Sequence, residues 1–436
     1  MDRVIRIGML GCGTVGSGVV TILDADDDDI AARTGAHLEV VRVCVRDVTK
    51  DRGLPLDPSV FTDDPQQVVA ADDVDVVVEV MGGRDPAGDL IRQALRAGKP
   101  VVTANKELVA HEGPALFEEA YANGVDLMYE AAVAGAIPII KPLKESLAGD
   151  QIRRVVAILN GTTNYILTRM SEDGVAYDDV LAEAKELGYA EADPTADVAG
   201  HDAASKAAIV ASLAFDTRVQ ADDVHREGIE RVTPTDIEVA TRLGYVVKLL
   251  AIITEDGEDD VAVRVHPTFL PREHPLASVR EAFNAIYVES DFAGELMFYG
   301  RGAGSHPTGS AVVGDLVDVA RNVLQTARGP VESQHRTKRI QPMDELRTQY
   351  YVLLEVEDVP GVLATVATVF GSHEVSIAQV WQTDDADRVR LVLITHRALE
   401  QHLRETVDDL ATTDGVREVV NVLRVESEIF GGGPAT

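Results

Sequence analysis

Short apolar runs alternate with helical patterns over residues 1–135 of the chain. The apolar runs have the length of buried strands and lie at 4–10, 38–45, 74–80 and 100–103, and the stretch at 86–97 has the spacing of an amphipathic helix. Strands that alternate with helices are typical of a parallel sheet covered on both faces. The pattern therefore predicts a doubly wound α/β domain.

The pattern changes after about residue 136, where longer helices mix with strands. The run at 245–254 is apolar enough for a core but too short to cross a bilayer. We predict an α+β domain over residues 136–327, whose last helix, at about 311–327, closes the domain and can pack back on the first one. Residues 328–349 are polar, basic and broken by Gly-Pro and Gln-Pro pairs, which predicts a linker.

Residues 350–436 follow a third pattern. Strand-like runs at 350–357, 375–382, 389–395 and 416–425 are interleaved with helical stretches at 362–371 and 398–410. This βαββαβ order is that of the ferredoxin-like unit. We therefore predict a separate C-terminal domain.

The charge balance excludes some classes of partner. The chain has 436 residues, 40 Lys+Arg and 73 Asp+Glu, which gives a formal net charge of −33. Such a charge disfavours nucleic acid and anionic membranes. No apolar run could span a membrane, and two cysteines cannot form a disulfide framework, so we expect a cytoplasmic protein. The acids are mostly Asp and the bases mostly Arg, which is typical of a salt-rich cytosol, although a GC-rich genome produces the same bias.

A glycine motif directly follows the first predicted strand. Gly11, Gly13 and Gly16 have the spacing GxGxxG, and a helical pattern follows. The first glycine makes the turn, the second lets the backbone approach a pyrophosphate, and the third packs the helix on the sheet. We predict a dinucleotide site in which Thr14 and Val15 open the helix that meets the pyrophosphate.

The end of the second strand bears on the choice of cofactor. Arg46 and Asp47 stand there, with Lys50 and Arg52 close behind. An NADP site uses Arg to meet the 2′-phosphate, whereas an NAD site places an acid on the ribose. Arg46 favours NADP, Asp47 leaves NAD open, and an arginine in a solvated loop is the structural alternative.

Two lysines are candidates for the chemistry. Thr103 and Lys106 follow the fourth strand, at the sheet edge where ligands bind, although Lys106 could be a surface lysine at a helix start. Asp202 and Lys206 are four residues apart and share one face of a helix. A carboxylate could hold a substrate ammonium there while the lysine protonates a carbonyl oxygen.

A purely structural interpretation of the same stretch is the alternative. Asp202 and Lys206 could form an ordinary helix ion pair, with Asp197 as an N-cap and Glu191 as a loop acid. Residues 129–138 are similarly ambiguous, because one carboxylate and several carbonyls in a small-residue loop suit Na⁺ or K⁺, but also a plain crossover. Neither cysteine has an evident base nearby, so we predict no thiol nucleophile.

Taken together, these segments resemble homoserine dehydrogenase along nearly the whole chain. The matching stretches are GCGTVG at 11–16, TANKELVA at 103–110, YEAAVAGAIPII at 129–140, LNGTTNYIL at 159–167, GYAEADPTADVAGHDAASK at 188–206 and YGRGAGSHPTGSAVV at 299–313. The C-terminal module resembles an ACT domain, with DVPGVLA at 358–364 as its ligand loop. This order of parts matches the longer, regulated form of the enzyme.

The resemblance implies reversible, nicotinamide-dependent interconversion of L-homoserine and L-aspartate 4-semialdehyde, in threonine, methionine and isoleucine biosynthesis. By position, Lys206 is the proton donor and Lys106 lies between cofactor and substrate. The other implied roles are substrate binding by Glu191, Asp202 and Asp197, a border between substrate and cofactor at Gly188, a loop of Gly302, Ala303 and Gly304 that closes on the cofactor, and a sodium site at Glu130 and the carbonyls of Val133, Gly135 and Ile137. K⁺ could replace Na⁺ in a salt-rich cell.

The resemblance also implies regulation and assembly. An ACT domain suggests feedback by L-threonine, with candidate contacts at Asp358, Gly361, Gln379 and Gln382. A dimerisation module without a ligand is the alternative, and the family implies a homodimer or a higher homo-oligomer. Two other functions stay open, namely an oxidoreductase for another amino-acid semialdehyde and a non-catalytic sensor of nicotinamide or amino acid.

Overall fold

The computed structural model describes residues 3–257, 259–330, 336–385 and 388–426. The chain forms two compact units, each assembled from three segments. The first unit comprises residues 1–153, 205–223 and 284–338, and the second comprises residues 154–204, 224–283 and 339–436. Within the described residues, no helix has both the length and the apolar character that crossing a bilayer requires.

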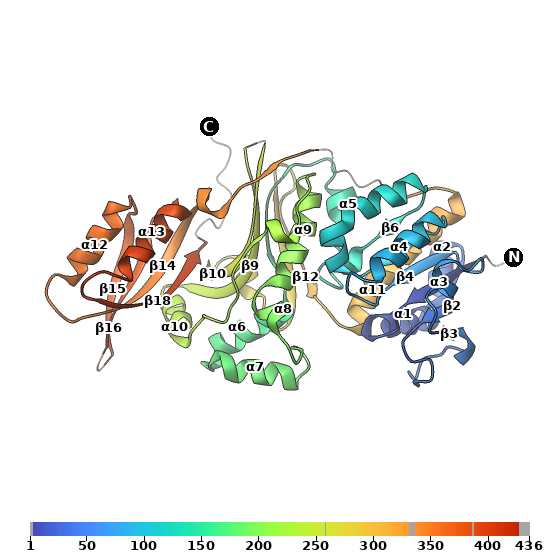
Figure 1. Cartoon of the computed structure of the whole chain (residues 1–436), viewed down its shortest axis with the longest axis horizontal. Coiled ribbons are helices and arrows are strands. Elements are labelled where there is room, and N and C mark those ends of the chain that lie inside the picture. The colour runs from blue at the N-terminus through green and yellow to red at the C-terminus, as the bar shows by residue number, and fades with distance from the viewer. Residues whose placement is uncertain (1–2, 258, 331–335, 386–387, 427–436) are drawn as a thin grey trace. The chain divides into compact units, whose positions relative to one another are not determined.

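A six-stranded parallel sheet forms the centre of the first unit (Figure 1). Its strand order is β3-β2-β1-β4-β5-β6, with β1 at Val4–Leu10, β2 at His37–Cys44, β3 at Phe61–Thr62, β4 at Val76–Glu79, β5 at Val101–Thr103 and β6 at Leu127–Met128. The order reverses between β1 and β4, and open α/β sheets bind ligands outside the carboxyl ends of strands at such a switch point. The predicted doubly wound sheet is confirmed.

Successive side chains on these strands enter two different hydrophobic cores. Met9 packs in the core under α1 (Thr14–Ala25), α2 (Asp27–Thr34) and α11 (Ser305–Gln325). Leu10 packs in the opposite core, under α3 (Gln66–Val69), α4 (Ala87–Arg96) and α5 (Lys106–Ala122). This alternation follows from the two-residue period of a strand.

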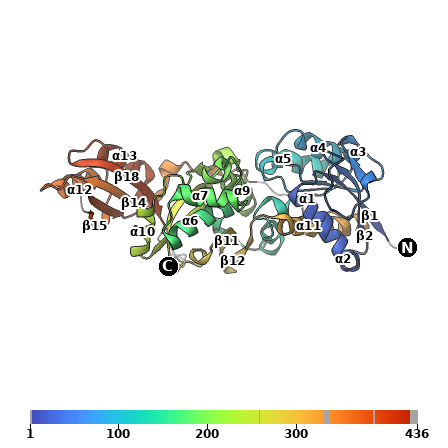
Figure 2. The same ribbon diagram turned by 90° about the horizontal axis from the view of Figure 1, so that it is seen from below.

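Helix α11 comes late in the sequence but packs beside α1 (Figure 2). The approach is close, because a Cβ added at Gly18 would lie 2.2 Å from the carbonyl oxygen of Ser305. The helix predicted at about 311–327 thus begins earlier than expected and belongs to the first unit.

The second unit contains a continuous sheet in the order β7-β9-β10-β18-β14-β16-β15. The bounds are Ile152–Ile158 for β7, Tyr245–Asp256 for β9, Asp260–Pro271 for β10, Arg347–Val356 for β14, Ile377–Asp385 for β15, Arg388–Thr395 for β16 and Val416–Val425 for β18. The short strands β8 (His225–Arg226) and β13 (Arg339–Ile340) also pair with β10, and β17 (Ala398–Leu399) pairs with β14.

The helices of the second unit are α6 (Gly161–Asp173), α7 (Tyr177–Glu186), α8 (Thr195–Val198), α10 (Pro234–Arg242), α12 (Val362–Ser372) and α13 (Glu400–Leu410). Helix α9 (His201–Ala214) crosses the division between the units, which falls after residue 204. Strands β11 (Phe283–Ser290) and β12 (Gly294–Arg301) belong largely to the first unit.

The predicted βαββαβ order is confirmed by β14, α12, β15, β16, α13 and β18, which enclose a core of their own. This module is joined to the central sheet, because β18 pairs in parallel with β10. In that pairing Arg424 of β18 lies opposite Thr268 of β10. The stretch predicted as a linker also contains β13, whose Arg339 pairs with Asp260 of β10, whereas residues 331–335 lie outside the described residues.

Candidate active site

The glycine motif lies at the switch point of the parallel sheet. Gly11 has a φ of +97°, and a Cβ there would lie 2.9 Å from the carbonyl oxygen of Val80, at the end of β4. A Cβ at Gly16 would lie 2.9 Å from the carbonyl oxygen of Gly11, whereas a Cβ at Gly13 would meet nothing within 4 Å. Two glycines are therefore required by the turn itself, and the third leaves open space. This arrangement fits a dinucleotide whose pyrophosphate approaches the start of α1 at Thr14.

The loop 302–304 lies in the same unit and leads into α11. Gly304 has a φ of +127° and precedes the first residue of the helix. A Cβ at Gly302 would overlap the side chain of Asn284, at 2.2 Å from Nδ2, and Ala303 is exposed. Since α11 packs on α1, the structure brings this loop to the helix that the glycine motif opens.

A buried carboxylate that the sequence analysis missed organises the neighbouring strand ends. Glu79, the last residue of β4, is fully buried. Its Oε1 accepts hydrogen bonds from the backbone N–H groups of Met81 (2.9 Å) and Gly82 (3.1 Å), and its Oε2 accepts one from Thr103 Oγ1 (2.6 Å). Thr103, predicted as a cofactor contact, therefore ties β5 to the loop after β4.

Lys106 lies one step further along this edge. Thr103 Oγ1 accepts from the Asn105 N–H at 3.0 Å, and the Asn105 side chain caps α5 by accepting from Leu108 N–H at 3.1 Å. The Asn105 amide also donates to the carbonyl oxygen of Gly83 at 2.6 Å. These bonds hold the partly exposed Lys106 at the first position of α5, at the carboxyl edge of the sheet.

Helix α9 carries the other predicted lysine. Asp202 and Lys206 are both buried, at 7% and 8% exposure, and stand one helical turn apart. Asn160, another residue that the sequence analysis missed, donates from Nδ2 to Asp197 Oδ1 at 2.7 Å and to Asp202 Oδ2 at 2.9 Å. One amide thus brings two of the predicted acids together, and it does so while its own oxygen caps α6.

Gly188 and Glu191 lie elsewhere in the second unit. Both are exposed on the segment between α7 and α8, where Gly188 has a φ of +75°. Asn160 joins Asp197 to Asp202, and the place of Gly188 and Glu191 in the substrate site stays a prediction.

The loop after β2 holds Asp47 in a turn of its own and leaves Arg46 exposed. Asp47 accepts hydrogen bonds from the Thr49 side chain (2.7 Å) and backbone N–H (2.9 Å), which lower the pKa of its carboxyl. Arg52 stacks over Phe61 and donates to the backbone carbonyl of Asp47. Arg46 is exposed beside them. Asp47 is thus engaged in its own turn, and Asp51 likewise accepts from the backbone N–H of Gly53.

The small-residue loop at 129–138 turns sharply in the first unit. Ala134 and Gly135 have φ values of 56° and 57°, and a Cβ at Gly135 would lie 2.5 Å from the carbonyl oxygen of Gly302. The Glu130 carboxylate, expected as a ligand, accepts three backbone N–H bonds, from Ile139, Ile140 and Lys141, at 2.6–2.9 Å. Among the described residues, no three His, Cys, Asp or Glu side chains gather as a metal site. A cation here would be held by neutral carbonyl oxygens, which is a donor set that suits an alkali ion.

Comparison with known proteins identifies the family. Residues 138–317 match the model of homoserine dehydrogenase, residues 11–130 match its NAD binding domain, and residues 350–414 match the ACT domain. A homoserine dehydrogenase of Mycobacterium tuberculosis is 51% identical over 435 residues, 98% of either chain. This chain belongs to the homoserine dehydrogenase family.

Solved structures agree with this assignment. The homoserine dehydrogenase from Thiobacillus denitrificans superposes with a TM-score of 0.92 at 41% identity, over 98% of this chain and 99% of that one. A hyperthermophilic archaeal homoserine dehydrogenase in complex with NADPH has a TM-score of 0.63 at 28% identity, over 74% of this chain and 98% of that one. As a homoserine dehydrogenase, the chain is an oxidoreductase that acts on a CH–OH group, and the alternatives of a sensor or another semialdehyde enzyme are not supported.

The ACT domain of this homoserine dehydrogenase presents its predicted effector residues at the surface. Asp358, Gly361, Gln379 and Gln382 are all exposed, and Gly361 has a φ of +102° directly before α12. Gln379 and Gln382 lie three residues apart on a regular stretch of the edge strand β15, so their side chains point to opposite faces. One ligand can therefore contact only one of the two on a given face.

Proposed function

We propose that this homoserine dehydrogenase moves the reacting proton with Lys206 and uses NADP as its hydride carrier. The observation that supports this most strongly is helix α9, on which Asp202 and Lys206 are buried and stand one turn apart. Two buried charges of opposite sign on one helix face suit a substrate that carries both an ammonium and a carbonyl oxygen. An exposed ion pair would place them at the surface instead.

Asp202 and Lys206 have different proposed roles, which follow from the charge of each side chain. Asp202, held with Asp197 by the Asn160 amide, accepts the hydrogen bonds of the substrate ammonium. Lys206 gives a proton to the aldehyde oxygen in the reducing direction and takes it from the homoserine hydroxyl in the oxidising direction. Three more residues belong to the proposed active site. Glu191 binds the substrate, Lys106 lies between cofactor and substrate, and Gly188 borders both. The nicotinamide, when bound, supplies or receives the hydride.

The test of the proton-transfer role is Lys206→Ala. We expect turnover to fall by at least about tenfold to a hundredfold, which is the contribution of a positioned general acid, while the fold survives. Lys185→Ala, which removes an exposed lysine of α7, is the matched control and should leave turnover unchanged. Normal turnover in the folded Lys206→Ala protein would contradict the assignment.

Arg46 supports NADP over NAD. It is exposed at the end of β2 beside an aspartate that is already engaged, and the archaeal relative was solved with NADPH. A guanidinium–phosphate contact is worth about 1.5–3 kcal/mol, or roughly ten- to a hundredfold in affinity. We expect Arg46→Ala to raise the KM for NADP⁺ by about that factor and to leave the KM for NAD⁺ unchanged. Arg33→Ala, on α2, is the control, and equal effects on both cofactors would count against the proposal.

The carbonyls of Glu130, Val133, Gly135 and Ile137 are the proposed site for Na⁺ or K⁺. The ion would hold the loop that packs on Gly302, and thereby the glycine loop. We expect the melting temperature to be higher in NaCl or KCl than in tetramethylammonium chloride of the same ionic strength. The same melting temperature in all three salts would contradict the proposed cation site.

For regulation, we propose that the ACT domain binds L-threonine through the loop of Asp358 and Gly361. We also propose that the enzyme is a homodimer or a higher homo-oligomer. It works in the cytoplasm, where its two free cysteines stay reduced. A threonine titration that changes neither the rate nor the melting temperature would leave dimerisation as the role of the module.

A further inference from the structure

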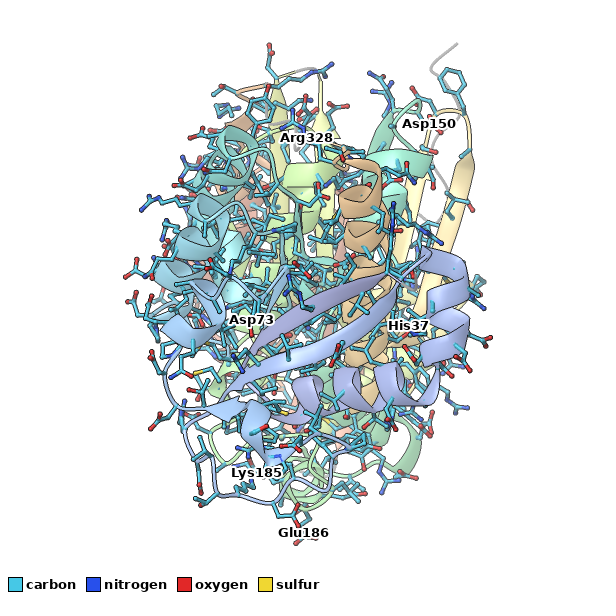
Figure 3. All side chains as sticks on the ribbon, turned by 90° about the vertical axis from the view of Figure 1, so that its right-hand side faces the viewer. His37, Asp73, Asp150, Lys185, Glu186 and Arg328 are labelled. Carbon is cyan, nitrogen blue, oxygen red and sulfur yellow. The ribbon has the colours of Figure 1, made fainter. Side chains whose placement is uncertain are left out.

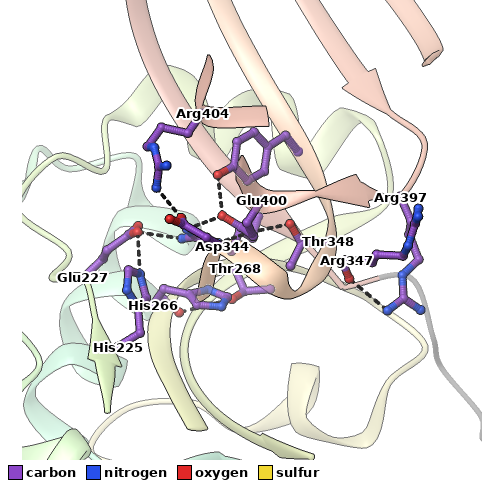
Figure 4. A network of polar contacts seen from close by, with 12 residues as sticks. His225, Glu227, His266, Thr268, Asp344, Arg347, Thr348, Arg397, Glu400 and Arg404 are labelled. Carbon is purple, nitrogen blue, oxygen red and sulfur yellow. Dashed lines mark hydrogen bonds and ion pairs between the residues drawn. The ribbon is translucent and has the colours of Figure 1, made fainter. Parts of the chain in front are cut away.

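The second unit contains a cavity of about 660 Å³ whose walls come from the central sheet and from the start of the ACT domain. Strands β7, β9 and β10 supply one side, with Arg154, Thr254 and Arg264 among the lining residues. Strand β14 and the turns before β14 and β17 supply the other. Figure 4 shows His266 and Thr268 of β10 on one side and Arg347, Thr348 and Arg397 on the other. None of the proposed effector residues of the ACT domain lines this cavity.

Both signs of charge line the cavity, with five arginines (Arg154, Arg264, Arg347, Arg397, Arg424) and four acids (Glu255, Asp256, Glu345, Glu426). The register of the sheet places three of the arginines on one wall. Arg264, His266 and Thr268 alternate along β10 and therefore share one face. Arg424 lies opposite Thr268 on β18, and Arg154 on β7 lies opposite Thr254 of β9. Guanidinium groups that share a wall repel one another unless anions lie between them.

Two of these three arginines have their anions within the chain. Arg154 pairs with Glu426 at 2.9 Å. Arg424 pairs with Glu400 at 2.7 Å and with Glu227 at 2.8 Å. Arg264 differs, because no hydrogen bond or ion pair reaches its guanidinium from any residue in the described part of the chain. Burial lowers the pKa of Arg264 to about 10; the charge of Glu426 opposes this shift, and the charges of Arg154 and Arg424 add to it.

The Nε2 atom of His266 is a second polar group in this cavity without a hydrogen-bond partner among the described residues. The residue is 1% exposed. Burial, followed by the charges of Arg424 and Arg264, holds the pKa of the ring well below its usual value, so the ring is neutral. Nδ1 lies 2.9 Å from Thr268 Oγ1 and 3.3 Å from the carbonyl oxygen of Pro267. If the Thr268 hydroxyl donates to Nδ1, Nε2 carries the hydrogen and is a donor, whereas if that hydroxyl donates to the His266 carbonyl oxygen and Nδ1 donates, Nε2 is an acceptor.

We propose that this cavity binds a small oxyanion-bearing metabolite, a carboxylate or a phosphate ester, with Arg264 as its principal contact. An oxyanion supplies the acceptors that the Arg264 guanidinium lacks and relieves the repulsion among the three arginines. The volume exceeds the need of a simple ion and lies within the usual range for organic ligands. The site is separate from the dinucleotide turn and from the ACT loop, so its ligand is a further one.

The test is isothermal titration of the full-length protein with inorganic phosphate and, separately, with succinate, at ionic strength held constant with chloride. We expect at least one of them to bind with a Kd in the millimolar range or below, and the one that binds tells a phosphate site from a carboxylate site. Arg264→Gln should weaken that binding at least about tenfold. Arg417→Gln makes the same change of charge on β18 outside the cavity, and should leave the binding unchanged.

Three results would overturn the proposal. The first is no binding of either probe by the unaltered protein, which needs no variant to fold. The second is equal binding by Arg264→Gln and Arg417→Gln. The third is a smaller assembly of Arg264→Gln in light scattering, because the guanidinium would then pair with a carboxylate of a second copy of this chain rather than with a metabolite.

Discussion

Glu79 shows how a single buried charge can order a ligand-binding edge. A carboxylate out of water is costly unless hydrogen bonds replace its hydration, and here three donors do so. Two of the donors are backbone N–H groups of the loop after β4, and the third is Thr103 on the next strand. The same side chain therefore fixes the loop beside the glycine turn and the turn that leads to Lys106. Glu79 is a positioning residue, since nothing places it on the substrate.

Glu79→Gln tests this role. A glutamine keeps the size but presents an NH₂ to one of the donors, so at least one hydrogen bond is lost inside the core. We expect the free energy of unfolding to fall by about 1–3 kcal/mol, and the KM for the nicotinamide to rise more than kcat falls. Denaturant melts and steady-state kinetics measure both quantities, with the exposed Glu118→Gln as control. A stability loss without any change in KM would make Glu79 a structural residue only.

The individual site residues were predictable where the motif is local. Gly11 and Gly16 follow a strand at a fixed spacing, and Lys206 lies one turn after Asp202, so sequence distance alone indicates their relation. Asn160 and Glu79 were missed because their partners come from remote segments, 42 residues away for Asp202 and 24 for Thr103. An acid inside the apolar run VDVVVEV, just before Met81-Gly82-Gly83, was the available signal for Glu79.

At the scale of elements, β18 joins the ACT domain to the central sheet, and an ion network accompanies the joint. Arg424 of β18 forms ion pairs with Glu400, at the start of α13, and with Glu227, directly after β8. Figure 4 labels both carboxylates. Burial raises the pKa of Glu227, but the hydrogen bond from His225 and the charge of Arg424 outweigh it and leave the pKa far below its usual value of 4.5. The ionised form of Glu227 therefore stabilises this joint.

The sign of the pH dependence follows from that depressed pKa. Stability contributed by Glu227 is fully present above about pH 4.5, its unfolded value, and is lost as the pH falls below it. We expect Glu227→Gln to lower the free energy of unfolding at pH 6–7, and the difference from the unaltered protein to shrink toward pH 3. Urea denaturation at several pH values measures this, with Glu230→Gln as the control. A difference that stays constant with pH would show that Glu227 does not act through its charge.

Element order was predictable, but the partners of the elements were not. The alternation of apolar runs gave the parallel sheet and the βαββαβ module, because periodicity is local. The order of parts allowed the helix at about 311–327 to pack back on the first domain, but it did not identify α1 as the partner of that helix. Nor could it show that β18 pairs with β10 across more than 150 residues of sequence, as in Thr268 with Arg424. Such pairings are decided by surfaces that exist only after folding, such as the glycine contact of Gly18 with Ser305.

At the scale of the whole molecule, carboxylates are in large excess, 73 Asp+Glu against 40 Lys+Arg. Figure 3 labels Asp73, Asp150 and Glu186 among them. With a net charge of −33, these groups repel one another, and salt screens that repulsion over about 10 Å at 0.1 M and about 3 Å at 1 M. We expect the melting temperature to rise between 0.1 and 2 M KCl. A flat or falling curve in thermal denaturation would favour genome composition as the source of the bias.

The glycine turn, the α9 pair and Arg46 are all proposed to serve one reaction, the transfer of hydride between homoserine and NADP⁺. The most direct measurement is the L-homoserine-dependent reduction of NADP⁺ and of NAD⁺ by the purified protein, followed by the absorbance of the reduced nicotinamide. We predict reduction of NADP⁺ that depends on homoserine and exceeds that of NAD⁺. Reduction of NAD⁺ alone would contradict the role of Arg46. Reduction of neither, by a folded protein that binds the cofactor, would contradict the account of the active site as a whole.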